Sequence, residues 1–155
     1  MCQINNKRLK FSGDLKVYKV LVDDGVNLKA PYHSEYRYTL GKKHEEEPTK
    51  KQFSFIPTAP AIIDEKYFHS FTNYSDAKST AVIREAANNS IFWELSMTES
   101  YYPFEQHYVV VECTIPEGTE VYQGEWQTSD GRYVPTTASK TIIPNKIIFE
   151  AKTAV

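Results

Sequence analysis

The chain has only two cysteines, no long apolar run and no excess of charge of either sign. Cys2 and Cys113 lie far apart in the chain, which is not the dense pattern of a disulfide-stabilised secreted domain. No stretch approaches the roughly 18 apolar residues of a membrane span, and the N-terminus lacks the apolar region of a secretory signal. These absences predict a cytoplasmic protein without a membrane partner.

The charges are 18 basic and 20 acidic side chains, which give a net charge of -2. The same-sign blocks are short, at Glu45–Glu47 and at Lys50–Lys51. A protein that binds duplex nucleic acid usually carries a clustered basic excess, so this class is disfavoured.

The length of 155 residues suits one domain. Short β-branched runs, broken by Pro-Gly and Pro-Asn signals, predict a β-meander in the C-terminal half: His107–Thr114, Val121–Tyr122, Thr141–Pro144 and Ile147–Phe149. Earlier strands are predicted at Leu15–Val22, Glu35–Leu40 and Tyr67–Phe71. We therefore expect a single α+β domain over residues 15–150, mostly antiparallel, preceded by a flexible or edge segment at 1–14.

One main helix is predicted at about 76–87. Ser75 is placed as its N-cap and Asp76 in its first turn, and Asn88-Asn89-Ser90 is placed as its stop. Its apolar stripe combines Ala77 and Ala81 with Ser79, Val82, Ile83 and Ala86. The next residues, Ile91–Met97, have strand propensity.

Four segments are predicted to be irregular. Gly41–Gln52 is charged and is expected to be an exposed loop, and Phe53–Ile63 carries two prolines and is expected to be an extended, packed connection. Thr98–Gln106 is expected to be an aromatic loop, and Gly124–Pro135 a long loop rich in turn signals.

No complete catalytic or metal motif is present. His33 and His44 lack a second ligand at metal spacing. Cys113 could pair with a histidine as a nucleophile, but its apolar strand favours an inert buried thiol. Three glutamates in or near the predicted meander are candidate acids or bases if they face a pocket, although most such side chains are solvated: Glu112, Glu120 and Glu125.

Two features favour binding. Residues 68–77 bring polar side chains to a predicted helix start, where backbone N–H groups favour anions, although the same residues are typical helix caps. Aromatic residues make up 14% of the chain, and loop aromatics stack bases or grip peptides, although tyrosine is also common in strands. The candidate ligand-binding residues are His69, Ser70, Thr72, Ser75, Tyr102, Trp126, Arg132 and Tyr133.

Five segments in order, KVYKVLV, YRYTLG, YFHSFTNYSDAK, YVVVECTIPEGTEVYQGE and ASKTIIPNKII, resemble a set of small proteins from bacteriophages of gut Bacteroidetes and their hosts. The likeness covers roughly residues 15–149 and brings no function with it. The resemblance implies that the protein is located in the cytoplasm of a bacterial host.

Residues Ser70, Thr72 and Ser75, followed by IPEGTEVY at 115–122, are similar to elements of the ADP-ribosyltransferase fold. The chain has Tyr18-Lys19 where that family has Arg or His, and Ser139-Lys140 where it has its catalytic Glu. The resemblance therefore implies an active site that is missing or rebuilt with Glu125 and His69.

Three hypotheses follow. The favoured one is a non-catalytic binding protein of phage type, without a cofactor, which captures a nucleotide-like ligand or blocks a host protein in counter-defence. The second is a divergent ADP-ribosyltransferase or another NAD-consuming enzyme. The third is a small structural or scaffold protein.

Overall fold

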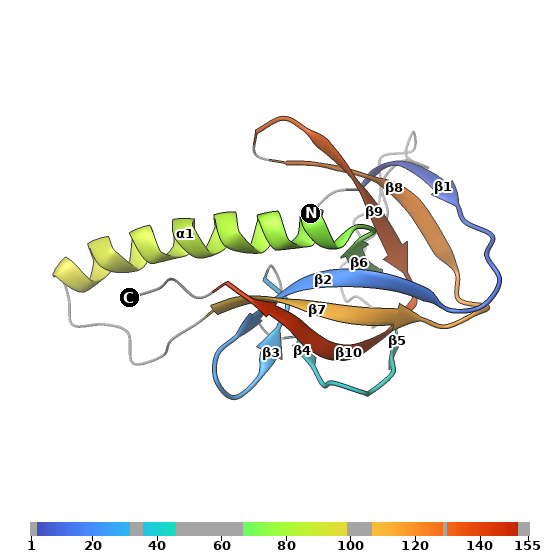
Figure 1. Cartoon of the computed structure of the whole chain (residues 1–155), viewed down its shortest axis with the longest axis horizontal. Helices are drawn as coiled ribbons and strands as arrows, with labels where there is room; N and C mark the ends of the chain where they lie inside the picture. Colours follow the sequence, from blue (N-terminus) through green and yellow to red (C-terminus); the bar gives the residue numbers. More distant parts are fainter. Residues whose placement is uncertain (1–2, 32–35, 46–66, 99–106, 129, 152–155) are drawn as a thin grey trace, which may run out of the picture.

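The computed structural model describes residues 3–31, 36–45, 67–98, 107–128 and 130–151 (Figure 1). Within these ranges, ten strands form one antiparallel sheet against a single helix, α1 (Tyr74–Thr98). The strands are β1 (Ile4–Arg8), β2 (Leu15–Asp23), β3 (Leu28–Lys29), β4 (Arg37–Tyr38), β5 (His44–Glu45), β6 (Phe68–Phe71), β7 (His107–Ile115), β8 (Val121–Gln127), β9 (Tyr133–Ser139) and β10 (Thr141–Glu150). The predicted α+β class, mostly antiparallel with one main helix, is confirmed.

The order of strands is β1-β8-β9-β6-β2-β7-β10-β5, with β3 and β4 attached beside β2. The meander predicted for the C-terminal half is wrong, because β7 lies between β2 and β10, and among β7 to β10 only β8 and β9 are neighbours in both sequence and space. Val109, Val110 and Val111 are each at most 1% exposed, so β7 is buried on both faces. In the sheet, β7 pairs with β2 along one edge and with β10 along the other.

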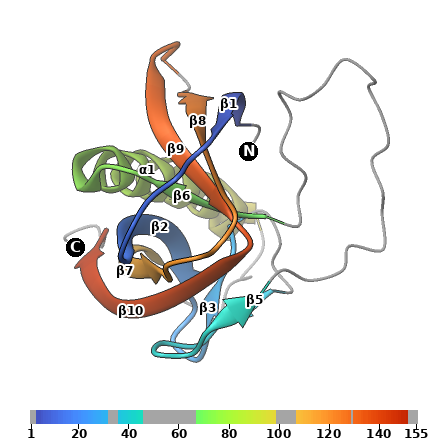
Figure 2. The same ribbon diagram turned by 90° about the vertical axis from the view of Figure 1, so that its right-hand side faces the viewer.

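The sheet has two differently covered faces, which we call the helix face and the far face. On the helix face, Val20, Phe71 and Val110 pack with Ala77 and Ala81 of α1. Figure 2 shows α1 lying within the curve of the sheet, while β3 and β5 lie on the other side of β2 and β7. The far face carries a second apolar cluster, which includes Val17, Leu21, Leu28, Tyr38, Phe68, Val111, Cys113 and Ile115.

Three predicted strands are found with bounds that shift by at most one residue, namely β2, β6 and β7. The two C-terminal runs join into β10, which continues through Pro144 with register shifts against β7 on the C-terminal side of that proline. Strand β1 forms an edge of the sheet, which was one of the two structures predicted for the N-terminal segment.

The helix is longer than predicted. It begins at Tyr74 and continues to Thr98, so the strand expected at Ile91–Met97 is wrong and Asn88-Asn89-Ser90 does not stop the helix. Asn and Ser each disfavour a helix by less than about 1 kcal/mol, which is too little to end one without a glycine or proline. The predicted stripe is also partly wrong, since Val82 and Ile83 are exposed.

Two predicted loops are wrong in part. The segment Gly124–Pro135 contains the end of β8 and the start of β9. These strands pair as far as Gln127 opposite Tyr133, so the turn is confined to the residues between those two. His44, expected in an exposed loop, is 7% exposed because β5 pairs with β10. The predictions for Phe53–Ile63 and for residues 99–106 lie outside the described residues.

Candidate functional site

The two candidate catalytic residues do not meet. Glu125 pairs with Pro135 and His69 pairs with Ala138, three positions further along β9. Because side chains alternate along a strand, Glu125 projects from the far face and His69 from the helix face. A shared acid–base site would need both on one face.

The predicted anion site at the helix start has one of the chain's own carboxylates, Asp76, beside it. The cap is Asn73 and not Ser75, since Asn73 precedes the first helical residue and its carbonyl accepts a 3.3 Å hydrogen bond from the N–H of Ala77. The Asn73 amide donates to Asp76, whose carboxylate lies in the first turn. The negative charge of Asp76 in the first turn already interacts favourably with the helix dipole, and it repels a second anion at the helix start.

The other candidate ligand-binding residues are dispersed. Trp126 stacks edge-on against Phe71 in the helix-face core, with ring centroids 5.6 Å apart. Thr72 lies beside Thr137, with 3.3 Å between their hydroxyl oxygens. Arg132 and Tyr133 are exposed at the β8–β9 turn, where Arg132 pairs with Asp130 at 2.8 Å. Tyr102 lies outside the described residues.

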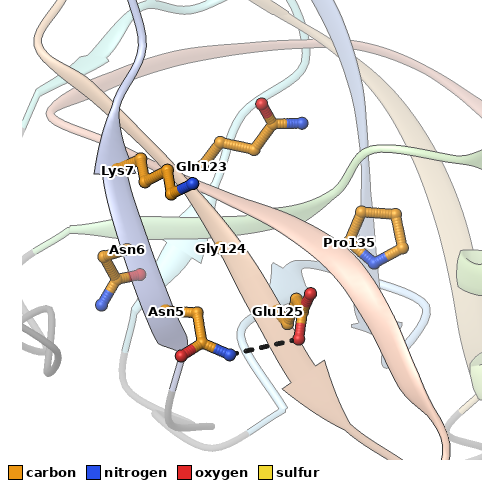
Figure 3. A pocket seen from close by; sticks show the side chains of 7 residues that line it. All are labelled: Asn5, Asn6, Lys7, Gln123, Gly124, Glu125 and Pro135. Atoms are coloured by element: carbon orange, nitrogen blue, oxygen red, sulfur yellow. Dashed lines mark hydrogen bonds between the residues drawn. The ribbon is translucent and has the colours of Figure 1, made fainter.

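A groove lies where β1 meets β8 (Figure 3). It is widely open to solvent, and its volume is about 630 Å³. Five of its seven lining residues have polar side chains, and the lining consists of Asn5, Asn6, Lys7, Gln123, Gly124, Glu125 and Pro135. The groove therefore offers amide donors and acceptors, one carboxylate and one ammonium group.

The floor of the groove depends on Gly124. A side chain there would meet Asn6 Oδ1 at 2.5 Å and the Ile4 carbonyl at 2.6 Å, so β1 approaches closely only because residue 124 has no Cβ. The pairing of β1 with β8 shifts register between Ile4 and Lys7, and Asn5 adopts a φ of 57° in that interval. This irregularity turns the Asn5 side chain toward Glu125, whereas the Asn6 amide lies against Gln3 and the Gly124 backbone.

A buried amide fixes β1 in place. The side chain of Gln3 accepts a 2.8 Å hydrogen bond from the Thr136 hydroxyl and donates to Asn6 Oδ1 at 2.7 Å and to the Tyr122 carbonyl at 3.2 Å. Gln3 is 0% exposed, so these bonds form away from water and are costly to break. The groove wall is therefore a preformed part of the sheet.

Glu125 and Asn5 face each other across the groove. The Asn5 amide donates to a Glu125 carboxylate oxygen at 3.3 Å (Figure 3). This is a long contact on an exposed surface, so a ligand can replace it at little cost. Sequence reasoning found Glu125 but missed the rest of the lining, because nothing in the sequence signals that β1 pairs with a strand more than 110 positions later.

The other two candidate glutamates are held by cations. Glu120 accepts hydrogen bonds from Lys140, Tyr67, Tyr122 and Arg8 over 2.7–3.2 Å. The Lys140 ammonium, and then the Tyr67 hydroxyl, lower the Glu120 pKa to about 2. Glu112 pairs with Lys16 at 2.9 Å, which lowers its pKa as well. Both are therefore ionised structural carboxylates and poor proton donors.

A buried carboxylate, Glu85, attaches the helix to the sheet. Its oxygens accept from the Tyr108 N–H at 2.7 Å and contact His107 Nδ1 at 2.8 Å. No sequence pattern signals this contact, since Glu85 stands outside the predicted apolar stripe. It explains how α1 is oriented on the start of β7.

The described residues contain neither a metal cluster nor a membrane-spanning helix. Among them, no group of three or more His, Cys, Asp or Glu side chains is placed to hold a metal ion. In the same ranges, no helix is both long and apolar enough to cross a membrane.

Comparison with known proteins found no matching family model, no matching curated protein and no matching solved structure.

Proposed function

We propose that the protein is a non-catalytic binding protein of phage type, which captures a nucleotide-like small ligand in the groove between β1 and β8. The observation that supports this most is the composition of the groove lining: amides, a carboxylate and an ammonium on a rigid wall. Capture of a host nucleotide signal would serve counter-defence, because it lowers the free concentration of that signal.

Each part of a nucleotide has a counterpart in the lining. Asn and Gln amides recognise base edges because they donate and accept side by side. Glu125 can accept from a ribose diol, and Lys7 can neutralise a phosphate. Tyr133 is 54% exposed and shares a face of β9 with Pro135 at the groove, which suits it to stacking on a base.

The test is a thermal-unfolding screen against NAD, ADP-ribose, mononucleotides and cyclic nucleotides, followed by calorimetric titration of each hit. A ligand at 100 times its Kd adds about 2.7 kcal/mol to the free energy of unfolding. Gln123→Ala should weaken binding at least tenfold. Gln127→Ala is the matched control, because Gln127 lies on the same face of β8 but outside the groove lining.

Equal affinity in the two variants would contradict the groove as the site. A flat screen would contradict nucleotide capture and favour a blocked host protein. The exposed β8–β9 turn with Arg132 and Tyr133 would then be the first surface to alter in a host-lysate pull-down.

The transferase alternative makes a different prediction. It requires binding and consumption of NAD, with loss of activity in both Glu125→Gln and His69→Ala. The opposite projection of these two side chains gives it no support. NAD binding without turnover would fit the binding protein and contradict the enzyme.

A further inference from the structure

The far face holds a buried ammonium group away from the groove. Lys19 is 7% exposed and projects between Val17 and Leu21 of the far-face core. Its Nζ donates a 2.6 Å hydrogen bond to the carbonyl of His69, and lies 5.3 Å from the centre of the Tyr38 ring. The ammonium therefore sits against the peptide that joins His69 to Ser70.

Among the described residues, none of the titratable groups around Lys19 supplies a negative charge. Burial raises the pKa of the Cys113 thiol to about 12, so it stays neutral. His44 accepts the Thr39 N–H at Nε2, and burial lowers its pKa, so it is a neutral imidazole. In the part of the chain that the structure describes, no carboxylate pairs with Lys19. Burial lowers the Lys19 pKa to about 8, which still leaves it mostly protonated at neutral pH.

Two buried hydroxyls lie on the far face of the neighbouring strands β6 and β9, and one of them, Ser70, follows His69. Ser70 is 1% exposed and Ser139 is 0% exposed, and neither Oγ has a hydrogen-bond partner among the described residues. Ser139 pairs with Phe68 and Ser70 pairs with Thr137 two positions away, so both hydroxyls project from the far face, within about 8 Å of each other. Buried polar groups without partners are rare, and such a group commonly binds an ion or a water molecule.

We propose that Lys19, Ser70 and Ser139 form an interior site for a small oxyanion of the phosphate or carboxylate class. All three groups can donate hydrogen bonds, and the His69 carbonyl already accepts one from Lys19. An oxyanion accepts from all three and neutralises the ammonium, which water does not do. The site is independent of the groove, and its test does not require a nucleotide.

The experiment is thermal unfolding at pH 6.8 and constant ionic strength, in which a bulky sulfonate is replaced stepwise by inorganic phosphate or by acetate. The wild-type Tm should rise and then saturate, by on the order of 5 °C at 100 times Kd. Lys19→Met and the double variant Ser70→Ala/Ser139→Ala should each lose the saturable rise.

Lys16→Met is the matched control. It removes the same charge from the same strand, but Lys16 is 63% exposed and pairs with Glu112. It should respond to phosphate or acetate as the wild type does. The two Ser→Ala changes remove only hydroxyls without partners, so the double variant should fold, as circular dichroism will check. A rise of equal size in all four proteins, or one without saturation, would overturn the proposal.

Discussion

Two charged clusters on the same sheet differ in how completely they are neutralised. Glu120 is surrounded by Arg8, Lys140 and two tyrosine hydroxyls, and each of these four groups donates to its carboxylate. Lys19 has one carbonyl acceptor and one aromatic ring, and its neighbours on the far face are neutral. The Glu120 cluster is neutralised by the chain's own cations, whereas no counter-ion for Lys19 lies among the described residues, and the proposed oxyanion would supply one.

The largest expected effect is a gain of stability in Lys19→Met. Burial lowers the Lys19 pKa from 10.5 to about 8, and at about 1.36 kcal/mol per pKa unit this difference corresponds to about 3 kcal/mol at neutral pH. The cost exists below pH 8 and disappears as the pH rises toward 10.5, because only the unfolded chain then keeps its proton. Urea unfolding at pH 7 and pH 10, in buffer without small oxyanions, measures this difference; a destabilised variant at pH 7 would show that the ammonium is already compensated.

The opposite sign is expected for Glu120→Gln, which should lose about 2 kcal/mol at pH 7, because a charged acceptor of several hydrogen bonds is removed. The Glu120 pKa is lowered, so its contribution is present above about pH 4.5 and disappears as the pH falls toward 2. Urea unfolding of both proteins from pH 7 to pH 3 should show the two curves converging. Parallel curves would contradict the role of the charge.

Two buried hydroxyl groups, of Thr136 and Ser70, should show the same difference with smaller changes in the free energy of unfolding. Thr136→Val should lose about 1–2 kcal/mol, because it leaves the buried Gln3 Oε1 without its 2.8 Å donor. Ser70→Ala should change the free energy of unfolding by less than about 0.5 kcal/mol in the absence of oxyanions, since no hydrogen bond is broken. A large loss in Ser70→Ala under those conditions would reveal a partner within the chain.

The smallest effect concerns His44. Its pKa is lowered by burial, so the unfolded chain takes up a proton first, and the folded chain loses stability as the pH falls below about 6.5. His44→Gln should show a weaker loss of urea stability between pH 7 and pH 5 than the wild type. An identical slope in both proteins would place the pH sensitivity elsewhere.

Local patterns predicted individual strands well and their arrangement poorly. The β-branched runs of β2 and β7 were found because a strand that is buried on both faces over its central residues carries a largely apolar run there. The neighbours of β7 were not found, because pairing between β2 and β7 joins segments more than 80 positions apart. The helix end was missed because weak helix formers do not stop a helix by themselves.

The candidate sites show the same division. Glu125 and Tyr133 were named from composition and loop signals, and both lie at or beside the groove. Asn5, Gln123 and the floor at Gly124 were missed, because they become a site only when β1 pairs with β8. Lys19 looked like one polar residue in an apolar strand, and its burial depends on β3, β4 and β6 coming together around it.

The most direct test of the contrast is the pKa of the Lys19 ammonium, measured by NMR titration of its ¹³Cε resonance, with Lys19→Met to assign the signal. Without a small oxyanion, the resonance should titrate with a pKa of about 8, and phosphate should raise that pKa. A pKa near the ordinary value of 10.5 in oxyanion-free buffer, unchanged by phosphate, would contradict both the uncompensated charge and the interior site.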